Sequence, residues 1–320
     1  MPLPTMKILH VALNYLGAHQ FGLERMLQSL GEYTQFDWMA EQKRGGFNGV
    51  KKMRMSLIAL AKRFKPDFTF FQIQSPDIFD LHTIQQIPGF KVNWTGDVRI
   101  DTPKWYFDLA PAFDVTLFTN MRDVENMRAA GHRADYFQIG YDENIYKPDV
   151  SLWPEIVFMG NNYPGHFPLS MFRLEVVEKL RAEYGTRFAV FGGGWPSHFG
   201  AENLNDKPER EAEFYRRAKI GINISHFVEP RYSSDRILRI IGSGCLCISH
   251  HYPGIEIEFP DVPTFNTIAE LIETVGRFIA DHQLREYTEN VTHLHVSKNH
   301  TWLSRANDIR RIYESKRIHN

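Results

Sequence analysis

The stretch Arg231 to Phe259 contains the residue types that a diphosphate site requires. Three N-cap types, Ser233 to Asp235, precede apolar residues at helical spacing, which predicts a helix over Asp235 to Ile241. Arg236 then falls in the first turn, where free backbone N–H groups and the positive end of the helix dipole favour phosphate. We expect Arg236 to hold a diphosphate without a metal, and to form its charge-assisted bonds with the ligand alone.

The second half of this stretch predicts a strand and a turn that lead to a carboxylate. Cys245 to Ser249 is short and apolar enough for a central parallel strand, and Pro253-Gly254 turns the chain toward Glu256. Open α/β sheets bind ligands at the carboxyl ends of their strands, so Glu256 is a candidate to accept hydrogen bonds from sugar hydroxyls; the alternative is a solvated loop residue. The residues of the whole stretch that we predict to bind the donor are Arg231, Ser234, Asp235, Arg236, Gly254, Ile255 and Glu256.

Two glycine-containing loops follow other predicted strands. Gly160 and Asn161 offer a close backbone approach to the diphosphate. Gly192 and Gly193 belong to a Gly-Gly-Gly-Trp sequence, whose backbone can reach the edge of a nucleobase while Trp195 or Phe191 covers a face of the base. This run fits neither glycine-rich nucleotide motif, so a flexible turn is an equal alternative.

Two residues in the first half of the chain are candidates for the general base that deprotonates an acceptor hydroxyl. His19 and Asp97 each follow a predicted strand, so both stand at a carboxyl end of the sheet. Histidine titrates near neutrality, and burial tunes the pKa of a carboxylate. Asp97 is the favoured candidate because Gly96 lets the backbone turn sharply before it, although an ion-paired loop with Arg99 is the alternative.

The order helix, glycine turn, strand, Pro-Gly, hydrophobic residue, Glu resembles the donor-binding half of GT-B glycosyltransferases, most of all the CgeB-like group of spore-maturation proteins. Three further segments agree with that group: Phe158 to Pro164, Gly140 to Pro148, and His300-Thr301-Trp302 with Arg305. The resemblance implies two Rossmann-like domains that face a cleft, with a nucleotide-sugar donor in the second. Retaining family 4 enzymes carry a Glu, commonly a ribose ligand, where this sequence has Arg239.

Length and composition agree with a two-domain α/β enzyme. A chain of 320 residues exceeds the usual span of one hydrophobic core, so we expect domains at 1–149 and 150–320, with the last helix crossing back to the first domain. A formal charge of −1 gives no general attraction to polyanions. The two cysteines, Cys245 and Cys247, are expected to be reduced and buried, and no apolar run reaches the length of a membrane span. We expect a cytoplasmic protein.

Strand-like and helix-like segments alternate along the chain, which predicts parallel sheets with helices on both faces. The first series of expected strands is 7–13, 36–40, 68–73, 91–95, 115–119 and 136–139, with helices at 23–30, 50–64, 77–87 and 121–130. The second series has strands at 156–159, 188–191, 220–224 and 245–249, and helices at 169–184, 208–218, 235–241, 268–281 and from 283 onward.

The expected function is metal-independent transfer of a sugar from a nucleotide diphosphate, with UDP the expected carrier, to a hydroxyl of a small saccharide, a lipid-linked acceptor or a protein. No cofactor or metal is expected. One alternative is glycosylation of a hydroxymethylated base in DNA, for which the basic segment 50–63 is the one candidate surface. Another is a noncatalytic protein that binds sugar nucleotides.

Overall fold

The computed structural model describes residues 6–14, 21–146, 154–204 and 207–314. The chain forms two compact units, Met1–Ile139 with Trp302–Asn320, and Gly140–Thr301. The expected division at Asp149 lies outside the described residues. The units divide ten residues earlier because Tyr141 and Tyr146 are buried in the hydrophobic core of the second unit.

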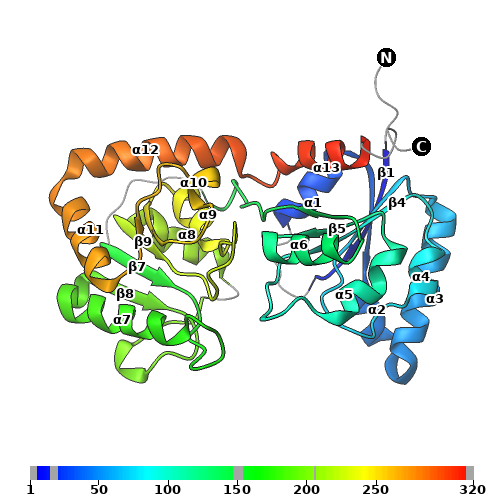
Figure 1. The fold of residues 1–320 in the computed structure, drawn as a ribbon, viewed down its shortest axis with the longest axis horizontal. Helices are drawn as coiled ribbons and strands as arrows, with labels where there is room; N and C mark the ends of the chain where they lie inside the picture. The colour runs from blue at the N-terminus through cyan, green and yellow to red at the C-terminus, as the bar shows by residue number, and fades with distance from the viewer. Residues whose placement is uncertain (1–5, 15–20, 147–153, 205–206, 315–320) are drawn as a thin grey trace, which may run out of the picture. The chain divides into compact units, whose positions relative to one another are not determined.

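The first unit is built on a six-stranded parallel sheet in the order β2-β1-β3-β4-β5-β6 (Figure 1). Its strands are β1 (Met6–Ala12), β2 (Gly31–Asp37), β3 (Phe68–Phe71), β4 (Phe90–Thr95), β5 (Val115–Phe118) and β6 (Ala134–Tyr136). Successive residues of the inner strands are buried on both sides, as in β1, where Ile8 and Leu9 are fully buried. Such continuous apolar strands require helices on both faces of the sheet.

Helices cover both faces of this sheet. One face packs against α1 (Phe21–Gln28) and α13 (Arg305–Glu314), and the other against α2 (Trp38–Arg44), α3 (Gly49–Phe64) and α4 (Leu81–Gln85). Two further helices, α5 (Lys104–Leu109) and α6 (Met121–Ala129), enclose a smaller core beside β5.

The end of the chain packs into the first unit. Trp302 is buried in the same cluster as Ile8 and Phe70, and its indole approaches α1 so closely that a Cβ on Gly22 would lie 2.1 Å from it. Ile309 of α13 is fully buried in this cluster as well. The crossing of the last helix, expected from the resemblance, is therefore secured by a large apolar contact.

The second unit has a five-stranded parallel sheet in the order β11-β10-β9-β7-β8. Its strands are β7 (Ile156–Met159), β8 (Phe188–Phe191), β9 (Ile220–Asn223), β10 (Leu246–His250) and β11 (Thr264–Phe265). Its helices are α7 (Ser170–Tyr184), α8 (Pro208–Arg217), α9 (Arg236–Gly242), α10 (Ile255–Glu258), α11 (Ile268–Ala280) and α12 (His282–Asn299). The two parallel α/β sheets confirm the predicted fold class.

Local hydrogen bonds and backbone conformation explain where the bounds of the elements differ from the prediction. The strand expected at 36–40 ends at Asp37, whose side chain accepts from the Ala40 N–H at 2.9 Å and begins α2. The helix expected at 77–87 is only α4, because Asp77 has a left-handed backbone with φ of 65° and Asp80 caps the helix start. Helix α5 was not predicted.

Cys245 and Cys247 are both buried and free, as predicted. Within the described ranges, no helix combines the length and apolar character that crossing a lipid bilayer requires.

Candidate functional site

Arg236 is the first residue of α9, as predicted, and its guanidinium spans the carboxyl ends of two strands. Nε donates to the carbonyl of Met159, the last residue of β7, and Nη1 donates to the Ile224 carbonyl just after β9 at 3.0 Å. The planar group lies 5.1 Å from the centre of the Phe158 ring. The expectation that Arg236 bonds only with a ligand was therefore wrong, because three of its contacts also join the strands.

A second arginine, which the sequence analysis missed, lies beside Arg236. Arg173 of α7 is only 2% exposed, and its guanidinium is 5.2 Å from the same Phe158 ring. A Cβ placed on Gly160 would lie 2.4 Å from Nη2 of Arg236 and 2.8 Å from Nη2 of Arg173. Both guanidinium groups thus converge on one point, which only a glycine leaves open.

These two cations have no counter-charge within the described part of the chain, where neither forms an ion pair with a carboxylate. The Nη1 of Arg173 donates to the ring of His226, 2.5 Å from Nδ1. Its buried Nε and Nη2 have no partner among the residues that the structure describes. Burial, and then the charge of Arg236, lower the pKa of Arg173 to about 9. Burial and the two arginines lower the pKa of His226 to about 3, so this ring is neutral and accepts the hydrogen bond. A buried pair of like charges of this kind is stabilised by an anion.

Neighbouring polar groups hold Arg236 in place. The hydroxyl of Ser234 donates to Asn223 Oδ1 at 3.0 Å and accepts from Arg236 Nη1 at 3.2 Å. The backbone N–H of Ser234 donates to the Ser225 hydroxyl at 2.9 Å. The structure thus shows Ser234 positioning the guanidinium. Asn223 was not predicted as a site residue. It is a polar residue at the end of the apolar strand β9, and this position could have indicated a role in the site.

The two glycine loops are hydrogen-bonded to each other. Gly160 N–H donates to the Phe191 carbonyl at 2.9 Å, and Gly193 N–H donates to Asn161 Oδ1 at 2.7 Å. Gly192 has φ of 123°, and a Cβ there would lie 2.3 Å from the Gly160 carbonyl oxygen. These glycines let the loops touch, and the N–H groups of Gly160, Gly192 and Gly193 are already used within the protein.

The aromatic residues beside these loops are also engaged inside the unit. Trp195 donates from Nε1 to the Gly160 carbonyl at 2.8 Å, and its ring packs edge-on against Phe158. Phe191 is 7% exposed and packs against Phe214. The hypothesis that Phe191 covers a nucleobase was therefore wrong, because its ring belongs to the core.

The other residues predicted for the donor lie around the loop before α9 and the short helix α10. Arg231 has a left-handed backbone with φ of 54°, and its Nη2 donates to Glu258 Oε1 at 2.9 Å. Gly254, at φ of 87°, precedes Ile255, whose side chain is buried. Glu256 is exposed in the first turn of α10. Of these side chains, Glu256 is the one whose carboxylate is open to solvent and to a ligand.

Arg239 of α9 forms ion pairs with two carboxylates inside the second unit. It donates to both oxygens of Glu211, at 3.2 and 3.0 Å, and is paired with Asp235, the residue just before α9. Its guanidinium lies 5.7 Å from the ring of Tyr146. The carboxylate of Asp235, predicted to bind the donor, is thus used in an ion-pair network with Arg239 and Glu211.

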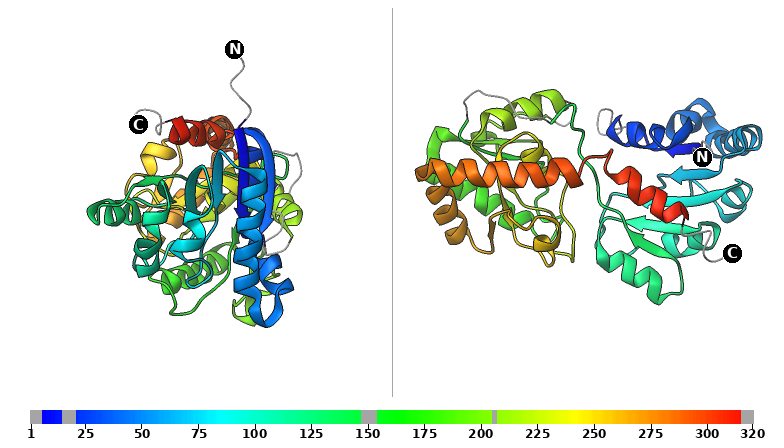
Figure 2. Two further views of the ribbon diagram at one scale, coloured as in Figure 1. Left: turned by 90° about the vertical axis from the view of Figure 1, so that its right-hand side faces the viewer. Right: turned by 90° about the horizontal axis from the view of Figure 1, so that it is seen from above.

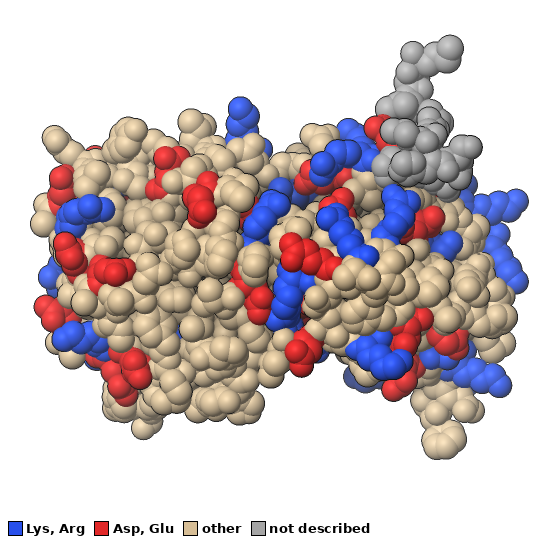
Figure 3. All heavy atoms as spheres, viewed as in Figure 1, with Lys and Arg blue, Asp and Glu red and all other residues tan. Residues whose placement is uncertain are grey.

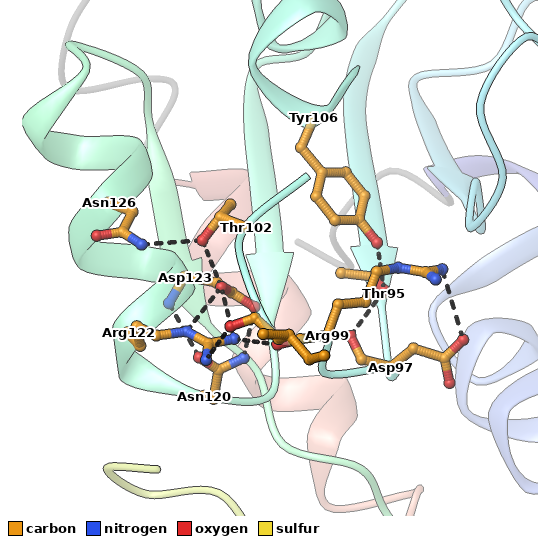
Figure 4. A network of polar contacts seen from close by, with 10 residues as sticks. Thr95, Asp97, Arg99, Thr102, Tyr106, Asn120, Arg122, Asp123 and Asn126 are labelled. Atoms are coloured by element: carbon orange, nitrogen blue, oxygen red, sulfur yellow. Dashed lines mark hydrogen bonds and ion pairs between the residues drawn. The ribbon is translucent and has the colours of Figure 1, made fainter. Parts of the chain in front are cut away.

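In the first unit, Asp97 lies two residues after β4 (Figure 4). Its carboxylate is 3.9 Å from Arg99 Nη2, and 59% of the side chain is exposed. Partial desolvation raises the pKa of Asp97, and the charge of Arg99 opposes this rise. Tyr106 donates to Thr95 at 2.9 Å and so braces the end of the strand that leads to Asp97. An exposed carboxylate with a raised pKa is suited to accept a proton.

The segment that follows Asp97 is fixed by a buried carboxylate, Asp123 (Figure 4). Asp123 is 2% exposed and accepts from the Thr102 hydroxyl at 2.5 Å and from Asn120 Nδ2 at 2.8 Å. Arg122 donates to the Arg99 and Ile100 carbonyls. This network holds residues 99–102 against α6.

The other candidate base, His19, lies outside the described residues. In the described ranges, no group of three or more His, Cys, Asp or Glu side chains is arranged to hold a metal ion.

A protein-family model described as glycosyl transferase-like matches residues 173–311, which include Arg173, Arg236 and Glu256. No curated protein matches the chain. Among solved structures, the sucrose-phosphate synthase of Thermosynechococcus elongatus has a TM-score of 0.66 at 9% identity, over 98% of this chain and all of that one.

Two other solved structures have similar scores. Anabaena Alr3699/HepE, in complex with UDP and glucose, has a TM-score of 0.65 at 11% identity, over 97% of this chain and 100% of that chain. The UDP-forming α,α-trehalose-phosphate synthase of Burkholderia vietnamiensis has a TM-score of 0.64 at 10% identity, over 99% of each chain. The likeness to these structures establishes the fold.

Proposed function

We propose that this chain, a glycosyltransferase of the GT-B fold by its architecture and its family match, takes its sugar from a nucleoside diphosphate sugar whose diphosphate binds Arg173 and Arg236. The observation that carries this proposal is the convergence of two guanidinium groups at Gly160, neither of which has a carboxylate partner in the described ranges. Unpaired guanidinium donors match the charge and geometry of phosphate oxygens. UDP is the proposed carrier, because Alr3699/HepE was solved with UDP-glucose.

The same pair would stabilise the leaving group during transfer. As the bond between the anomeric carbon and the phosphate oxygen breaks, negative charge accumulates on the departing diphosphate. Two fixed cations beside it stabilise that charge more in the transition state than in the bound donor. This is the charge that a divalent metal supplies in other transferases, so we propose that the reaction needs no metal.

The acceptor in this proposal is a hydroxyl group of a saccharide, a lipid-linked sugar or a protein. The hydroxyl oxygen forms the new bond to the anomeric carbon, and its proton passes to a base. Asp97 is the proposed base because its carboxylate is exposed and has a raised pKa. Glu256 is proposed to bind hydroxyls of the donor sugar from α10.

The test is a panel of UDP-, GDP-, ADP- and TDP-linked sugars, scored by the shift of the melting temperature and by release of the nucleoside diphosphate. A donor that binds only the folded state must raise the melting temperature. We expect one nucleotide to stand out and its diphosphate to be released when an acceptor is supplied. A shift without any release, over a broad set of acceptors, would instead identify a noncatalytic binding protein.

A further inference from the structure

One segment of the first unit has a large excess of positive charge. Residues 38–65 contain eight Lys and Arg residues and one acidic residue, Glu41, whereas the whole chain has 37 basic and 38 acidic residues. The net charge of the chain is close to zero because this basic segment is balanced by an excess of acidic residues in the rest of the chain. A local field of this kind attracts an anionic surface even when the net charge does not.

The structure places these charges on the solvent side of α2 and α3. Helix α3 buries Met53, Leu57 and Ala61 against the sheet, and this stripe fixes its orientation. Lys51 and Lys52 of the first turns are exposed, as are four basic residues on the rest of the segment: Lys43, Arg44, Lys62 and Arg63. Helix α3 runs along the outside of the first unit (Figure 2, left), and Figure 3 shows Lys and Arg side chains along that edge.

Large apolar side chains are exposed among these cations. Phe47, in the short 3-10 turn Gly46–Asn48 between α2 and α3, is 105% exposed, and Met55 of α3 is 62% exposed. An open groove of about 970 Å³ runs beside them and is lined by Ile58 and Ala59 as well as by Lys51 and Lys62. The acid in the lining, Asp80, is already paired with Arg54.

We propose that this basic face, defined as the exposed side of residues 43–63, docks on the surface of an anionic lipid bilayer. Cations meet lipid phosphates while Phe47 and Met55 enter the boundary between headgroups and acyl chains, as in interfacial amphipathic helices. Nucleic acid is the less suitable partner, because its phosphates contact the cations but leave a fully exposed phenyl ring in water. The face lies on the surface of a bilayer and does not span it.

Vesicle sedimentation of the full chain tests this proposal. We expect binding to vesicles of phosphatidylcholine with 30% phosphatidylglycerol, weak binding to pure phosphatidylcholine, and loss of binding as salt rises. Each Lys or Arg near such a surface contributes about 1 kcal/mol, or about fivefold, so Lys51→Glu with Lys52→Glu lowers the partition coefficient at least about 30-fold. Phe47→Ser lowers it about 10-fold through lost apolar insertion.

Matched controls lie on the second unit. Lys179→Glu with Lys298→Glu changes the net charge equally at exposed positions, and Leu294→Ser removes an apolar side chain that is 69% exposed. These variants should bind the vesicles like the wild type, and all variants should keep the wild-type melting temperature and donor affinity. Equal binding by the two charge variants, or no wild-type binding at 20 mM salt, overturns the proposal. So does tight duplex DNA binding that needs Lys51 and Lys52 but not Phe47.

Discussion

Replacing Arg173 with Met should change the affinity for the donor and the free energy of unfolding in different directions. The two Nη2 atoms, 2.8 and 2.4 Å from the Cβ position of Gly160, are at most about 5 Å apart, where two unit charges repel by about 3 kcal/mol at an effective dielectric constant of 20. Met keeps the apolar stem and removes this repulsion, together with two buried nitrogen atoms, Nε and Nη2, that have no partner among the described residues. The lost hydrogen bond from this charged group to His226 offsets about 1.5 to 3 kcal/mol of that gain.

We therefore expect Arg173→Met to leave the free energy of unfolding unchanged or to raise it by up to about 1.5 kcal/mol, while the donor binds more weakly. A hydrogen bond to a charged group contributes about 1.5 to 3 kcal/mol, so the Kd for the donor nucleotide should rise about 10- to 150-fold. Calorimetric titration with UDP and urea denaturation of the ligand-free protein measure the two quantities. The pKa of His226, followed by NMR, should rise from about 3 because the neighbouring cation is gone.

Arg181→Met is the matched control on the same helix. Arg181 lies two turns further along α7, where its Nη2 donates to the Phe199 carbonyl at 3.2 Å, and it has no contact with Gly160. Its replacement should leave donor affinity unchanged. If Arg173→Met binds UDP like the wild type, or if it loses more than about 3 kcal/mol of stability, Arg173 is a structural residue and does not bind the diphosphate.

Asp97→Asn should keep donor affinity and lower turnover about 10²- to 10⁴-fold. The activity of the wild type should fall as the pH drops through the raised pKa of Asp97. If His19→Ala loses this turnover and Asp97→Asn does not, His19 is the base. Donor affinity should survive EDTA, and a loss that magnesium or manganese restores would contradict a metal-free site. Gly160→Ala should weaken UDP binding, because its Cβ displaces the guanidinium of Arg236, whereas unchanged affinity would place the diphosphate elsewhere. Burial lowers the pKa of His10 to about 4, so between pH 6.5 and 4 this ring binds a proton in the unfolded chain but not in the folded one. The free energy of unfolding should therefore fall by up to about 3 kcal/mol as the pH drops from 6.5 to 4. His10→Gln should make the free energy of unfolding less dependent on pH over this range.

Much of the fold was predictable because the strands are continuous apolar runs. The bounds of β7 and β8 agree with the prediction, since Ile156–Met159 and Phe188–Phe191 are flanked by polar or glycine residues. Segments where a side chain competes for backbone hydrogen bonds were less predictable. Asp37 and Asp80 each cap a helix start, and a capping carboxylate is not distinguishable in sequence from a surface acid.

Half of the cationic pair could be predicted from local sequence. Arg236 follows N-cap residues and precedes an apolar run, which fixed its place at the start of α9. Arg173 lies 63 positions earlier, within a helix, and only the fold brings the two together. The sequence did contain an indication of this role. Arg173 lies on the same buried face of α7 as Val176, Val177 and Leu180, where an arginine is rare unless a partner group binds it.

The network around Arg239 could not be predicted for the same reason. Its partner Glu211 belongs to α8, and the pairing depends on how α8 packs beside α9. Arg239, which stands where the resemblance would place a ribose ligand, forms an internal ion pair instead. Sequence spacing locates a side chain on an element, but the element that faces it is set by the packing of the whole unit.

The most direct test of the central claim is a crystal structure of the protein with a nucleoside diphosphate bound. We expect β-phosphate oxygens within about 3 Å of Nη2 of both Arg173 and Arg236, over Gly160, with no metal between them. A diphosphate bound away from this pair, or held through a divalent cation, would contradict it.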